Sequence, residues 1–146
     1  MKVQDILKSK GAELVTIGQQ DSLVEAYRLL SEHNIGVLLV MDKQGKPVGI
    51  ISERDLVHEF AKRGPAVEKA TVQEAMTEDL IIGVPEDDLE YVMNVMTQQR
   101  IRHLPILDGD ELAGLISIGD VVKSQITQAE AEIRYLHSYI TGSPTG

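Results

Sequence analysis

The feature that most constrains the fold is a short sequence that occurs twice. Gly49-Ile50-Ile51-Ser52-Glu53-Arg54-Asp55 and Gly114-Leu115-Ile116-Ser117-Ile118-Gly119-Asp120 share a glycine, two branched apolar positions, a serine and an aspartate in the same order. Upstream, identical residues recur 66 positions apart (for example 89 − 23 = 66), and within the motif the separation is 65 (120 − 55 = 65) because the preceding turn is one residue shorter in the second copy. The upstream pairs are Leu14 and Leu80, Asp21 and Asp87, Leu23 and Leu89, Ile35 and Ile101, Leu38 and Leu104, and Asp42 and Asp108. The chain is therefore two copies of one unit, each of which has little core of its own, so we expect the two copies to pack together.

Each copy predicts the same order of elements. A leading helix (residues 3–8 and 72–76) precedes a short apolar strand (14–17 and 80–82), and apolar residues spaced by three and four then predict an amphipathic helix. A hairpin follows, with strands 36–41 and 48–51 in one copy and 103–107 and 112–116 in the other, before a final helix at Ser-x-x-Asp. The predicted fold class is α/β (α+β), with two β-α-β-β-α units packed sheet against sheet in pseudo-two-fold symmetry. We expect the first unit to span residues 1–66, the second 67–127, and a helical extension with a frayed tail 128–146.

The repeated motif also predicts a polar pocket. A strand that runs straight into a helix delivers a serine hydroxyl and an aspartate carboxylate to the first helical turn, where backbone N–H groups are free. A carboxylate there can accept both hydrogens of a cis-diol. The alternative is that Asp55 or Asp120 only caps its helix, which explains either residue alone equally well but explains the matched pair less well.

Composition and charge exclude several functions. The 146 residues carry a net charge of −9 and contain no tryptophan and one phenylalanine, which argues against binding to nucleic acid. There is no cysteine, so disulfides and cysteine metal sites are excluded. The absence of a long apolar run or a signal peptide predicts a cytoplasmic protein without a membrane partner. No phosphate-binding Gly-x-x-x-x-Gly-Lys-Ser/Thr loop, metal-ligating histidine pair or serine with an obvious base is present, so an enzyme is the least expected class.

The last predicted helix continues past the end of the repeat. Its apolar residues follow steps of 4, 3, 4, 3 and 4, which is the spacing of a heptad seam: Val122, Ile126, Ala129, Ile133, Leu136 and Ile140. We expect this seam to bind a helix from a second subunit, and packing back on the same domain is the alternative.

The two copies of the motif, together with Arg102-His103-Leu104-Pro105-Ile106, resemble a tandem pair of cystathionine-β-synthase (CBS) domains, also called a Bateman module. The resemblance covers about residues 3 to 127 and is strongest to the short bacterial stand-alone type. It implies a module without catalytic activity that binds an adenosyl ligand (AMP, ADP, ATP, NAD or S-adenosylmethionine) in clefts between the repeats. It also implies a homodimer that reports binding to a protein target which the sequence does not identify.

The resemblance assigns roles to particular residues. The two aspartates and the serines before them would hold ribose, the first-strand and central-strand positions would hold the base, and Arg54, Arg102 and His103 would hold phosphates. Gly36 would let a flat base approach the backbone, whereas its counterpart Arg102 would not, so we expect two pockets of unequal affinity. The predicted nucleotide-binding residues are Thr16, Ile35, Gly36, Val37, Ser52, Arg54, Asp55, Ile82, Arg102, His103, Leu104, Pro105, Ser117, Gly119 and Asp120.

Two other functions remain open. One is a structural interaction module whose pockets bind nothing. The other is a sensor that responds to S-adenosylmethionine or to magnesium, with Glu86-Asp87-Asp88 as a weak candidate for the ion. His33, His58 and His137 are expected to face solvent, and no role is assigned to them.

Overall fold

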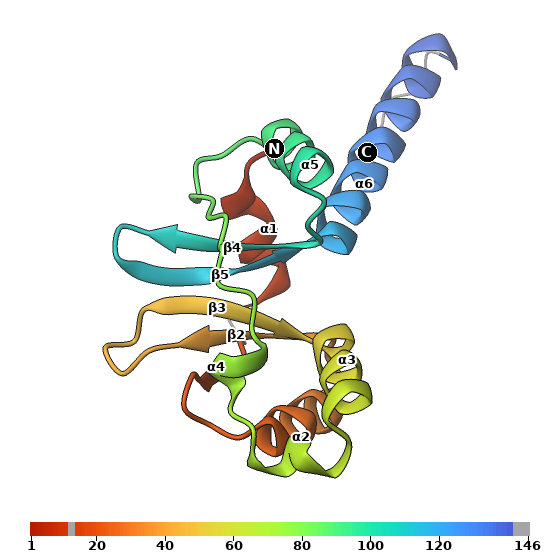
Figure 1. Ribbon diagram of the computed structural model, residues 1–146. Helices are drawn as coiled ribbons and strands as arrows, with labels where there is room; N and C mark the ends of the chain where they lie inside the picture. Colours follow the sequence, from red (N-terminus) through yellow and green to blue (C-terminus); the bar gives the residue numbers. More distant parts are fainter. Residues whose placement is uncertain (12–13, 142–146) are drawn as a thin grey trace.

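The computed structural model describes residues 1–11 and 14–141 and contains two small sheets that face each other, with helices on their outer sides (Figure 1). The first unit consists of β1 (Thr16–Gly18), α2 (Leu23–His33), β2 (Val37–Met41), β3 (Pro47–Ser52), α3 (Glu53–Arg63) and a 3-10 helix (Gly64–Lys69). The second consists of α5 (Leu89–Gln99), β4 (His103–Asp108), β5 (Glu111–Ser117) and α6 (Ile118–Thr141). Two leading helices, α1 (Val3–Lys10) and α4 (Val72–Ala75), precede them in the chain. The mixed α and β character and the doubled unit are confirmed.

The two sheets differ by one strand. In the first, β1 lies parallel to β2, and β2 pairs with β3 in an antiparallel hairpin. In the second, β4 and β5 form the same hairpin, but the strand predicted at residues 80–82 is wrong, since only one parallel bridge forms, between Gly83 and Ile106. That bridge consists of Gly83 N–H donating to the Pro105 carbonyl (2.9 Å) and Leu107 N–H donating to the Gly83 carbonyl (3.0 Å). The next bond of a parallel ladder would come from the amide of residue 105, and proline has no N–H to donate.

The helices of the two units end in the same way. Asn34 and Arg100, 66 residues apart (100 − 34 = 66), terminate α2 and α5 in the left-handed conformation, with φ of 52° and 55°. An arginine is an unusual residue for this conformation, which asparagine and glycine adopt more readily. The backbone repeat therefore holds even where the side chains have diverged.

Each leading helix packs on the opposite unit. The buried core of the first unit includes Val72 of α4, and that of the second includes Val3 and Ile6 of α1. Matched backbone bonds fix this exchange: Val72 N–H donates to the Asp21 carbonyl at 2.8 Å, and Val3 N–H donates to the Asp87 carbonyl at 2.9 Å. Each unit therefore packs against the leading helix of the other, and α1 lies against the second sheet.

Helix α6 extends away from the body of the molecule (Figure 1). The large apolar residues of its seam are exposed, from 47% at Val122 to 82% at Ile140, so the seam does not pack back on its own domain. Binding to a helix of a second subunit stays a prediction. Within residues 1–11 and 14–141, no helix is long and apolar enough to cross a membrane.

Candidate functional site

The repeated Ser-x-x-Asp motif forms a capping box in both units. The Ser52 hydroxyl accepts from the Asp55 N–H at 3.2 Å, and Asp55 Oδ2 accepts from the Ser52 N–H at 2.9 Å. Ser117 and Asp120 make the same two bonds, at 3.1 and 2.9 Å. Both aspartates therefore do cap their helices. Over the part of the chain that the structure describes, the hydrogen bonds to both carboxylates fall on Oδ2, and Oδ1 accepts none.

Strand register places each motif beside its predicted base segment. Ser52 pairs with Val37, and the Glu53 N–H donates to the Gly36 carbonyl at 3.0 Å. In the second unit Ser117 pairs with His103, and Ile118 N–H donates to the Arg102 carbonyl at 2.8 Å. The hairpin therefore brings ribose and base candidates together within each unit.

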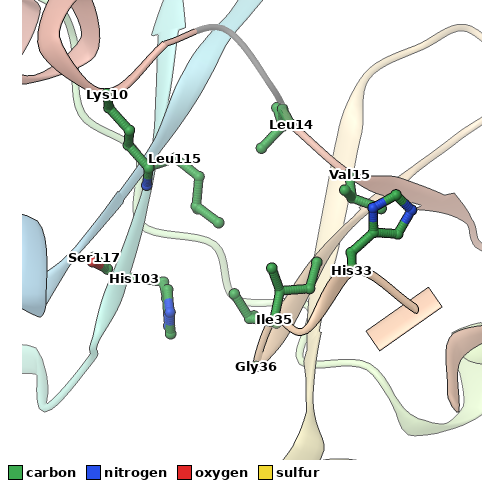
Figure 2. Close-up of a pocket in the computed structure, with 10 residues that line it drawn as sticks. Lys10, Leu14, Val15, His33, Ile35, Gly36, His103, Leu115 and Ser117 are labelled. Atoms are coloured by element: carbon green, nitrogen blue, oxygen red, sulfur yellow. The ribbon is translucent and has the colours of Figure 1, made fainter. Parts of the chain in front are cut away.

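A cavity of about 290 Å³ lies between the two units (Figure 2). Five predicted residues line it, three from the first unit and two from the second: Ile35, Gly36, Val37, His103 and Ser117. Lys10, Leu14, Val15, His33 and Leu115 complete the lining. A Cβ added to Gly36 would meet no atom within 4 Å, so the space beside this backbone is open. The volume of about 290 Å³ lies just below the range of about 300–1,000 Å³ typical of small-molecule sites.

The other predicted residues lie outside this lining. Leu104 and Pro105 are buried in the second unit, and Ser52 and Asp55 are half-buried at the start of α3. Asp120 is half-buried at the start of α6, and five others are exposed: Thr16, Arg54, Ile82, Arg102 and Gly119. His33, for which no role was predicted, is exposed as expected but also borders the cavity.

Asp120 lines a second cavity, of about 410 Å³, between α1 and α6. Lys10, at the end of α1, borders both cavities. Its Nζ donates to Asp120 Oδ2 at 2.8 Å and to the Leu115 carbonyl at 2.8 Å. Sequence reasoning missed Lys10 because it lies outside the repeated motif and reaches Asp120 only through the exchange of the leading helices.

Local charges set the protonation of two site residues. Partial burial lowers the pKa of His103, and the nearby Lys10 lowers it further against the opposing charge of Asp120. Partial burial opposes ionisation of Asp120, but hydrogen bonds from Lys10 and Ser117 outweigh it and lower the pKa of Asp120. At neutral pH the site therefore holds an ionised carboxylate, an ammonium and a largely neutral imidazole. Among the described residues, no group of three or more histidines and acids is arranged to hold a metal ion.

Comparison with known proteins identifies the repeated unit. The family profile for the CBS domain matches residues 3–62 and again residues 72–126. CBS domain-containing protein CBSX3, mitochondrial, of Arabidopsis thaliana is 32% identical over 148 residues, which cover 96% of this chain and 72% of that protein.

Solved structures share the fold as well. The CBS-domain containing protein ATU1752 from Agrobacterium tumefaciens superimposes with a TM-score of 0.80 at 40% identity, covering 86% of this chain and 99% of that chain. The CBS domain pair of protein MJ0100, solved in complex with 5′-methylthioadenosine and S-adenosyl-L-methionine, gives a TM-score of 0.76 at 27% identity and covers 88% of this chain and 98% of that chain.

Proposed function

Because the chain belongs to the CBS-domain family and carries a pair of these domains, we propose that it is a non-enzymatic regulatory module. Its ligand is an adenine nucleotide (AMP, ADP, ATP or NAD), bound in the cleft between the units. The observation that carries this proposal is the cavity between the units, which is lined by base-segment residues of one unit and by His103 and Ser117 of the other.

The chemistry of the cavity fits the parts of a nucleotide. Ile35 and Val37 offer apolar surface to a base, and the open space at Gly36 allows close approach to the backbone. Lys10 and His103 offer N–H donors that suit a phosphate. The adenosyl ligands of the MJ0100 domain pair support the same ligand class here, and the ammonium of Lys10 in the lining favours an anionic nucleotide over the sulfonium of S-adenosylmethionine.

Calorimetric titration tests the proposal. Wild-type protein is titrated with AMP, ATP, NAD and S-adenosylmethionine, and we expect micromolar to millimolar binding of at least one nucleotide. Asp55→Ala and Asp120→Ala should each weaken binding if both pockets are used, whereas Asp110→Ala, an exposed carboxylate in the second hairpin turn, serves as the matched control. Absence of heat with all four ligands at millimolar concentration would sink the proposal.

We further propose that the module acts as a homodimer through α6. The exposed residues of α6 repeat at heptad spacing, and a second copy of the same seam offers a self-complementary partner. Ligand binding between the units would change their relative position and so the geometry of the dimer presented to a protein target.

The structural alternative makes a different prediction. A module whose pockets bind nothing keeps the same melting temperature in the presence of nucleotides, because only a ligand that binds the native state raises it. A thermal shift with AMP or ATP that disappears in Asp120→Ala would exclude that alternative.

A further inference from the structure

Lys10 holds the carboxylate that the proposed function assigns to ribose. Its ammonium lies 2.8 Å from Asp120 Oδ2, and a second hydrogen bond, to the Leu115 carbonyl, fixes the ammonium there. A diol that bound both oxygens of Asp120 would have to take the place of this ammonium. Lys10, a residue of the same chain, would therefore compete with ribose for Asp120.

The ion pair is weak enough to be displaced. The side chains of Lys10 and Asp120 are 37% and 23% exposed, and a pair this accessible to water contributes little to stability. The lysine side chain is long and flexible, so its ammonium can move without any change in the backbone of α1. Displacement then costs this ion pair and the hydrogen bond to the Leu115 carbonyl, and nothing in the core.

The displaced ammonium stays beside the ligand. Lys10 lines both the cavity between the units and the cavity that contains Asp120. A ligand that occupied both cavities would lie beside this shared residue, and His103 borders the first cavity on the same side (Figure 2). A phosphate at this point would accept the hydrogen bonds that Lys10 gives up.

We propose that Lys10 is an internal competitor for Asp120 that is transferred to the phosphate of a bound ligand, so that this pocket selects phosphorylated adenosyl ligands over unphosphorylated ones. The inference rests on the proposed function. An unphosphorylated adenosine breaks the Lys10–Asp120 pair and offers the ammonium no anion in return. A nucleotide breaks the same pair and replaces it with a charge-assisted hydrogen bond.

The first unit lacks this device. Leu7 and Met76 occupy matching places, each against the glycine of the repeated motif, Gly114 and Gly49 respectively. Three residues further along stand Lys10 in one leading segment and Asp79 in the other (7 + 3 and 76 + 3). The selection should therefore belong to the Asp120 pocket alone.

The test compares adenosine with AMP by calorimetry in an Asp55→Ala background, which isolates the Asp120 pocket. Removing the competitor with Lys10→Met should tighten adenosine binding by about threefold or more, as for a weak ion pair. It should also lower the AMP-to-adenosine affinity ratio by about tenfold, the value of one charge-assisted hydrogen bond. Lys10→Arg should keep most of the ratio, and Lys8→Met, an exposed lysine on the same helix, should leave it unchanged.

The dependence of the two affinities on salt concentration gives a second test. Raising the salt concentration weakens the Lys10–Asp120 pair, so adenosine should bind the Lys10-containing protein more tightly, while AMP should bind it less tightly. These opposite changes are not expected if the role of Lys10 is only structural. If AMP and adenosine bind but Lys10→Met leaves their ratio unchanged, the role of Lys10 is refuted and the nucleotide-binding function stands. Loss of binding in the Asp55→Ala background refutes that role equally, because the Asp120 pocket then holds no ligand. If the wild-type chain binds neither ligand, both the proposed function and the role of Lys10 are refuted.

Discussion

Replacing Gly49 with alanine should destabilise the protein because another part of the chain crosses the strand at this residue. A Cβ at position 49 would lie 2.5 Å from Met76 Sδ and 3.0 Å from the Thr77 carbonyl oxygen. The methionine side chain can rotate, but the Thr77 backbone is held by two hydrogen bonds to Ile50, at 2.9 and 3.0 Å. The added methyl group therefore overpacks a contact that can yield only if the backbone at Thr77 moves away from β3.

The expected loss follows from two opposing contributions. Overpacking a core contact costs about 1–3 kcal/mol. Alanine also reduces the conformational freedom of the unfolded chain, which stabilises the fold by about 0.4–1 kcal/mol where the backbone is compatible. We therefore expect Gly49→Ala to lower the free energy of unfolding by about 1–2 kcal/mol.

Two other glycines provide graded controls. A Cβ at Gly114 would lie 2.6 Å from the end of the Leu7 side chain and no closer than 3.7 Å to the next atoms, so a rotation of Leu7 can relieve it. A Cβ at Gly36 would contact nothing within 4 Å. Urea unfolding at fixed protein concentration should rank the three alanine variants from Gly49, the least stable, through Gly114 to Gly36. A Gly49→Ala protein as stable as Gly36→Ala would refute the reasoning from close approach.

Three further predictions concern the site and the assembly. Gly36→Ala should fold normally but weaken nucleotide binding in calorimetry, because its methyl group enters the open space of the cavity between the units. Unchanged affinity would show that the base does not bind at this position. Burial lowers the pKa of His103 in the folded protein below its ordinary value of 6.5 in the unfolded chain. As the pH falls, the unfolded chain therefore binds a proton at His103 before the folded protein does. Part of the free energy of unfolding is thus present above about pH 6.5 and is lost below it. His103→Gln should flatten that loss in urea unfolding measured across this range, and an identical pH profile would contradict it. Ile133→Asp should convert a dimer to a monomer in analytical ultracentrifugation while Gln128→Asp, off the seam of the same helix, should not, and equal masses for both variants would exclude a dimer through α6.

The elements of the fold were largely predictable because they depend on local chemistry. The spacing of apolar residues placed α2 and α5, and turn residues placed both hairpins within a few positions of their observed ends. The capping role of Asp55 and Asp120 was also predictable, since Ser-x-x-Asp satisfies free N–H groups wherever it starts a helix. The strand at residues 80–82 was predicted wrongly, because its apolar residues carried no sign that the neighbouring strand would present Pro105 in place of a donor.

The site itself was only partly predictable. Ser117 was found through the repeat and Gly36 and His103 through the resemblance to CBS domains, and the structure brings all three to one cavity. Lys10 could not be found, because nothing in its neighbours along the chain relates it to a residue 110 positions away.

The amino-acid sequence by itself determined that two like units exist, which segments become helices and strands, and which side chains each hairpin presents, because these follow from short-range periodicity and capping. Only the tertiary structure decided that each leading helix packs on the opposite unit, since the buried faces of α1 and α4 are apolar and short and fit either core by sequence alone. That exchange allows Lys10 to form an ion pair with Asp120 and brings Met76 into contact with Gly49. The two copies of the repeated motif have different surroundings because the residues that contact them come from the other half of the chain.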